Sequence, residues 1–187
     1  PNNIRLIALD TVNANGGWQG CIDRVQWAWF VDLLANSSDK YVILTSHHPL
    51  EKIFNDYSPE GVPTPAVRKE IQALLFKYRN IILWVCGHNH QNFINQIKRE
   101  DGSHAFWHIR TASHIDWPQQ SRVLEFLKDD ESKSVYIVST VIDHNGHVEP
   151  DLDRLEVLDL AGLSRILAFN DYQRRDPLLS MHRKEGN

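Results

Sequence analysis

The sequence predicts an α/β fold with a mixed sheet and flanking helices. Over the first half of the chain, short apolar runs alternate with amphipathic segments, which is the order of parallel strands covered by helices. Over the second half, apolar runs are separated by turn-like segments, which is typical of antiparallel strands. The chain has 187 residues, 42% of them hydrophobic and 24% charged, so its size and composition are those of one globular domain.

Three apolar runs of the first half are predicted as buried strands, at residues 4–10, 41–46 and 81–87. Asp23 is a candidate N-cap for a helix that runs to about residue 34. A second helix is predicted over residues 62–78, because prolines stand near its start and apolar residues follow at helical spacing.

The second half predicts four antiparallel strands and a closing helix. The strands are expected at residues 93–98, 104–109, 122–127 and 134–140. Asp151 is a candidate cap for an amphipathic helix. We expect residues 1–173 to form one domain and residues 174–187 to form a tail.

Composition excludes several classes of function. The net charge is −4 and no basic patch is apparent, so nucleic acid is not expected as a partner. The apolar runs are far shorter than the about 20 residues of a spanning helix, so no membrane span is expected in this chain. Cys21 and Cys86 lie outside the Cys-x-x-Cys spacing of zinc sites. Ten histidines remain as candidate metal ligands.

Two histidine clusters directly follow buried strands. His88 and His90 stand in a Gly-His-Asn-His run after the third strand, and His47 and His48 precede Pro49 after the second. Functional sites of open α/β sheets lie beyond the carboxyl ends of strands, so the two clusters should lie side by side. In extended backbone, residues two apart point the same way at about 6 to 7 Å. An isolated His-x-His pair is as readily a chance surface feature.

The His-x-Pro turn at His47 and the Gly-His-x-His motif at residues 87–90 resemble the last two blocks of the calcineurin-like metallophosphoesterase superfamily. The resemblance implies that His47 and His88 bind one metal and that His90 binds the other. It implies two divalent or mixed-valence transition metals, Mn, Fe or Zn, which suit imidazole ligands. It also implies that the chain is the C-terminal half of a four-layer αββα sandwich.

The region from Leu9-Asp10-Thr11 through a glycine-rich loop to Gln26-Trp27 is similar to the cyclic-nucleotide and glycerophosphodiester phosphodiesterase branch. The earlier blocks of the family, Asp-x-His, Gly-Asp-x-x-Asp and Gly-Asn-His, are absent and would precede Ile4. We therefore expect an N-terminal half outside this chain and little activity of the chain alone. That half or a second copy is expected to cover the exposed sheet edge.

The implied reaction is hydrolysis of a small-molecule phosphomonoester or phosphodiester. Two cations lower the pKa of a bridging water, and the resulting hydroxide attacks phosphorus. The alternative is a non-catalytic metal-binding or scaffold fragment. The compartment stays open: a cytoplasmic protein is favoured, and an exported parent is not excluded.

Two further residues are candidates for the same site, each with a blander alternative. His48 lies beside a ligand position and either contacts substrate or packs against Pro49. Asp10 either orients the site through a hydrogen bond or caps the turn that follows its strand. The six tryptophans are expected in the core and at the rim of the site.

Overall fold

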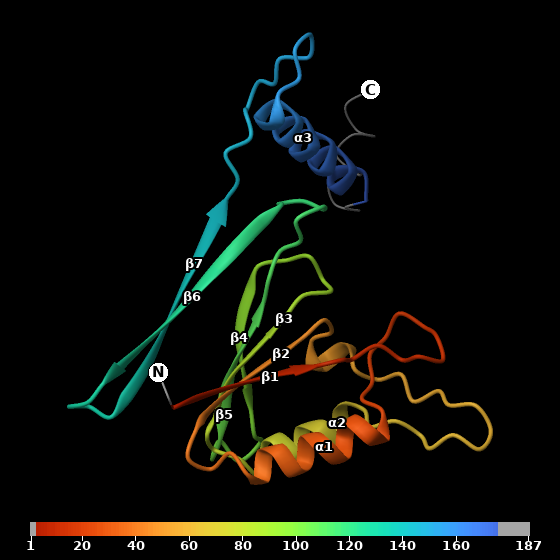
Figure 1. Ribbon diagram of the computed structural model, residues 1–187, viewed down its shortest axis with the longest axis vertical. Coiled ribbons are helices and arrows are strands. Elements are labelled where there is room, and N and C mark those ends of the chain that lie inside the picture. The colour runs from red at the N-terminus through yellow and green to blue at the C-terminus, as the bar shows by residue number, and fades with distance from the viewer. Residues whose placement is uncertain (1–2, 176–187) are drawn as a thin grey trace. The chain divides into compact units, whose positions relative to one another are not determined.

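The computed structural model describes residues 3–175, and these divide into two compact units (Figure 1). The first unit runs to Arg110 and the second begins at Thr111. The predicted domain over residues 1–173 therefore contains two units, and its boundary stays a prediction. Of the predicted tail, Arg174 and Arg175 end the last helix, and the rest lies outside the described residues.

A five-stranded mixed sheet forms the first unit, in the order β1-β2-β3-β5-β4. Neighbours from β1 to β5 are parallel, and β4 is antiparallel to β5 at the edge. The predicted mixed α/β fold is thus confirmed, although the strand expected at residues 104–109 also pairs in parallel with β3. The strands are β1 (Ile4–Leu9), β2 (Tyr41–Ser46), β3 (Ile81–Cys86), β4 (Phe93–Lys98) and β5 (Ala105–Arg110).

Helix α1 (Arg24–Ala35) begins at the predicted cap, because the Asp23 carboxylate accepts hydrogen bonds from two backbone N–H groups of the first turn. Helix α2 (Arg68–Leu75) is shorter than the predicted 62–78. Val67 is still extended, and proline restricts the residue before it to extended backbone, so the Pro-rich segment at 62–67 cannot join the helix. A short 3-10 turn, η1 (Leu50–Lys52), directly follows His47, His48 and Pro49.

Both helices cover one face of the sheet and close the hydrophobic core (Figure 1). On α1 the buried residues are Phe30 and Leu34, whereas Val25 and Trp29 are exposed. On α2 the buried residues are Ile71, Leu74 and Leu75. Burial of each such side chain contributes about 1.5 to 3 kcal/mol to the free energy of folding. This core therefore supports the carboxyl ends of the strands, where the histidines follow.

The second unit consists of a two-stranded antiparallel ribbon and one helix. The ribbon is formed by β6 (Gln120–Asp129) and β7 (Ser134–Asp143), as predicted, although β6 is longer at both ends and β7 at its C-terminal end. Helix α3 (Val157–Arg175) begins six positions after the predicted cap. The Asp151 carboxylate instead accepts from the N–H groups of Asp153 and Arg154, which closes a separate turn. No helix of residues 3–175 has the length and hydropathy of a membrane span.

Candidate metal centre

The carboxyl ends of β2 and β3 bring the two histidine clusters together. Ser46 and Cys86, the last residues of these strands, are partners in the parallel register. The Gly87 N–H then donates to the carbonyl of His47 at 3.0 Å. Because the strands end side by side, the loops that follow them must leave the sheet as neighbours, as the sequence predicts.

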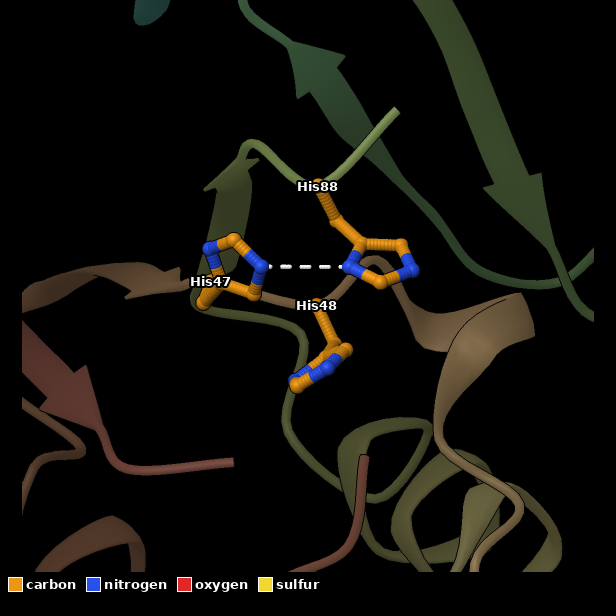
Figure 2. A group of neighbouring side chains, drawn as sticks. All are labelled: His47, His48 and His88. Atoms are coloured by element: carbon orange, nitrogen blue, oxygen red, sulfur yellow. Dashed lines mark hydrogen bonds between the residues drawn. The ribbon is translucent and has the colours of Figure 1, made fainter. Parts of the chain in front are cut away.

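His47 and His88 lie within hydrogen-bond distance of each other. Nε2 of His47 is 3.1 Å from Nδ1 of His88, and the ring centroids are 5.1 Å apart (Figure 2). Two imidazole nitrogens bound at about 2.0 to 2.1 Å to one tetrahedral ion stand about 3.3 Å apart. The observed pair therefore has nearly the spacing that a single shared ion requires.

Ligand atoms of three histidines, His47, His48 and His88, all lie within 4.8 Å of one another. This is the one such group of potential ligands in the described part of the chain. Burial, followed by the neighbouring charges of His48, His47 and Lys52, lowers the pKa of His88 to about 4. The neutral imidazole is the form that binds a metal, so His88 needs no deprotonation near neutral pH.

The Gly-His-Asn-His run does not continue the strand. His88 and His90 have φ angles of 68° and 54°, so the assumption of extended backbone at these residues is wrong. β3 ends at Cys86, where its register with β2 and β5 ends, and the Asn89 N–H donates back to the carbonyl of Gly87 at 2.8 Å. Left-handed backbone at a non-glycine residue costs about 1 to 3 kcal/mol and concentrates at functional sites.

His90 is not among the three grouped ligands, but it lies near them. Its charge contributes to the lowered pKa of His88. Its positive φ means that it does not share with His88 the parallel arrangement of side chains that extended backbone would give. The role of His90 at a second metal stays a prediction.

His48 is buried, and both of its ring nitrogens have partners. Nε2 lies 3.0 Å from the carbonyl of Trp18, and Nδ1 lies 2.8 Å from the Thr11 hydroxyl. A carbonyl only accepts, so Nε2 carries the proton and Nδ1 accepts from Thr11. Burial lowers the pKa of His48, in keeping with a neutral ring. In this arrangement His48 fixes the loop that carries Trp18, and its contact with substrate stays a prediction.

Asp10 adopts the turn-capping alternative. Its carboxylate accepts from the Val12 N–H at 2.9 Å, and its backbone N–H and carbonyl both bond the Gln26 amide. These bonds tie the end of β1 to α1. A role for Asp10 in orienting the metal ligands stays a prediction.

Three residues beside the histidines were not singled out by any motif. The Trp18 ring stacks on His88 with 5.8 Å between centroids and 8° between planes. Lys52 Nζ lies 5.3 Å from the Trp18 ring centroid, and Phe54 meets the same ring edge-on. The sequence predicts tryptophans at the rim of the site but does not indicate which of the six lies there. The sole signal for Lys52 and Phe54 is that they follow His47 closely in the same connection.

Comparisons with known proteins give local similarity to phosphatases. The chain is 33% identical over 79 residues to tartrate-resistant acid phosphatase type 5 of Oryctolagus cuniculus, covering 42% of this chain and 22% of that enzyme. A dimetal phosphatase from Danio rerio has a TM-score of 0.38 and 18% identity, over 54% of this chain and 30% of that one. No protein-family model matches the chain. The chain thus spans about a fifth of the curated relative's length.

Proposed function

We propose that the chain is part of a calcineurin-like metallophosphoesterase, which its local similarity to tartrate-resistant acid phosphatase type 5 supports, and that the intact protein hydrolyses phosphoesters with bound metal ions. The observation that carries the proposal is the 3.1 Å approach of His47 Nε2 to His88 Nδ1 at the carboxyl edge of the sheet. The phosphatase similarity covers 22% of the relative, so the reaction of the whole protein is part of the proposal.

His47 and His88 are proposed to hold one ion, and His90 is proposed to contribute to a second. When bound, two transition-metal ions supply Lewis acidity that lowers the pKa of water and offsets charge on the phosphoryl oxygens. Mn, Fe and Zn suit the histidine ligands. The buried ring of His48 keeps the adjacent loop in place through Thr11 and Trp18, so the ligands face a preformed site.

The proposed substrate is a small-molecule phosphomonoester or phosphodiester, and the phosphodiesterase branch suggested by residues 9–27 is part of the same proposal. The alternative is a metal-binding or scaffold role without hydrolysis. The ligand group of residues 3–175 consists of histidines alone, which is the observation that keeps this alternative open. Both the hydrolase and the non-catalytic metal-binding fragment would take up metal, but only the hydrolase would turn over a phosphoester.

The test of the metal centre is calorimetric titration of Mn²⁺ and Zn²⁺ into the chain. We expect His88→Ala to weaken uptake by more than about tenfold, since loss of an outer partner alone changes affinity by about 10 to 100-fold. His114→Ala is the matched control, because that histidine bonds Ser121 in the second unit and should leave uptake unchanged. Equal uptake by wild type and His88→Ala would contradict the proposal.

Turnover separates the two roles. We expect the chain alone to hydrolyse bis-p-nitrophenyl phosphate poorly, because the ligand group of the described residues contains three histidines and no carboxylate. Robust hydrolysis that His47→Ala abolishes would show that this group suffices for turnover.

A further inference from the structure

Exposed aromatic rings stand directly beside the histidine pair. Trp18 is 58% exposed and Phe54 is 48% exposed, although the two rings contact each other at 6.1 Å between centroids. Trp18 also stacks on His88, so these rings continue the surface of the candidate metal centre. Large aromatic rings left in water beside a polar site offer apolar area to a ligand.

The loops that carry these rings are bonded to each other through their backbones. The Gly20 N–H donates to the carbonyl of Lys52 at 2.8 Å, and the Asn55 N–H donates to the carbonyl of Gly20 at 2.9 Å. The Asn55 side chain donates to the carbonyl of Gly16 at 2.7 Å. Together with the bond from His48 to Trp18, these contacts hold the rings in place before a ligand arrives, which reduces the entropy lost on binding.

Lys52 adds an unpaired cation to the same surface. Its Nζ lies 5.3 Å from the Trp18 ring centroid, and no carboxylate of residues 3–175 forms an ion pair with it. A metal ion bound at the histidines would add further positive charge beside this cation. An anion such as a phosphoryl group would restore the balance.

We propose that Trp18, Phe54 and Lys52 form a substrate-binding wall that selects phosphoesters whose organic group carries a planar aromatic ring. Lys52 binds the phosphoryl oxygens, and the ligand ring packs on the exposed parts of Trp18 and Phe54. When the ammonium group turns to the phosphoryl group, the indole surface that it covered becomes available to the ring. This inference rests on the proposed function, because it takes the histidine pair as the place where phosphorus is bound.

The test compares two phosphonates that cannot be hydrolysed as esters, phenylphosphonate with a ring and ethylphosphonate without one. Both are titrated by calorimetry into the Mn²⁺-loaded chain. We expect wild type to bind the phenyl probe about tenfold more tightly, the ratio that one stacked ring gives. Trp18→Leu should bring the ratio near one, and Phe54→Leu should lower it. Trp29→Leu is the matched control, since that exposed tryptophan lies on α1.

Lys52→Gln separates the charge from the rings. We expect it to weaken both probes by a similar factor and to leave their ratio unchanged. Equal affinity of wild type for the two probes, or a ratio that Trp18→Leu leaves intact, would overturn the inference. Failure of either phosphonate to bind would overturn it as well.

Metal uptake distinguishes this failure from failure of the proposed function. If Mn²⁺ uptake still depends on His88 but phenylphosphonate binds no more tightly than ethylphosphonate, only the proposed substrate-binding wall is contradicted. If wild type takes up no Mn²⁺, the metal centre itself is wrong. Mn²⁺ uptake is also measured for Trp18→Leu, because the indole ring stacks on His88, and circular dichroism checks that each variant is folded.

Discussion

The two units of the chain use their apolar residues differently. The buried apolar residues among residues 3–175 all belong to the first unit, between Ile7 and Ile109. In the second unit, Leu160 and Leu167 of α3 are 51% and 59% exposed. Its internal contacts include the packing of Trp117 on Phe169 and polar contacts, such as the bond between His147 Nδ1 and Asp159 and the ion pair of Arg165 with Asp143. The candidate site is therefore carried by the unit that has a packed core, which gives it fixed geometry.

The largest expected effect follows from that difference in packing. Ile71→Ala on α2 removes a fully buried side chain and should lower the free energy of unfolding by about 2 to 5 kcal/mol. Ile166→Ala on α3 is the matched change at a residue that is 39% exposed, and it should cost about 0.5 kcal/mol or less. Urea unfolding measures both, and equal effects would contradict the contrast between the units.

Gly20→Ala tests whether the core also fixes the loops of the site. A Cβ at this residue would lie 2.8 Å from Cγ of His48, which Thr11 and Trp18 hold in place. We expect the overpacking to cost about 1 to 3 kcal/mol in urea unfolding and to reduce metal uptake.

Gly87→Ala is the matched control for that change, because the atom nearest to its Cβ would be the His47 carbonyl oxygen at 3.9 Å. It should leave stability close to that of wild type. A larger loss in Gly87→Ala than in Gly20→Ala would show that the His48 contacts are not what holds the loop.

The smallest effect concerns pH and the second unit. The hydrogen bond from His147, followed by those from the Asp151 and Glu156 N–H groups, holds the pKa of Asp159 below its ordinary 3.8. The carboxylate therefore stabilises the fold above pH 3.8, and this contribution is lost as the pH falls through the lower, folded-state pKa. Acidification below that pH should speed amide exchange at residues 147–159 in wild type relative to Asp159→Asn.

Amides of β3 are the internal reference for this measurement, because they belong to the unit with the packed core. An acid response of equal size in wild type and Asp159→Asn would show that the carboxylate does not stabilise this region.

Local sequence signals predicted the strands and the meeting of the histidine clusters. Apolar runs mark β1, β2 and β3, and parallel pairing alone brings the ends at Ser46 and Cys86 together. The resemblance supplied the roles of the histidines, and these roles stay predictions. The mixed sheet is confirmed, whereas the four-layer sandwich concerns more than the described residues and stays a prediction.

Features that depend on tertiary contacts were missed. His88 and His90 adopt left-handed backbone just beyond the end of strand pairing at Cys86, and their residue types do not predict this conformation. The start of α3 depends on Asp159, whose side chain accepts the N–H groups of Asp151 and Glu156 at the preceding turn. The contact between Trp18 and Lys52 joins two loops that are distant in sequence.

X-ray absorption at the zinc edge of the Zn²⁺-loaded chain tests the central claim most directly. A metal held between His47 and His88 should show imidazole nitrogens at about 2.0 to 2.1 Å, with fewer of them in His47→Ala and in His88→Ala. Imidazole scattering that neither substitution changes, or a zinc ion surrounded by oxygen ligands alone, would contradict it.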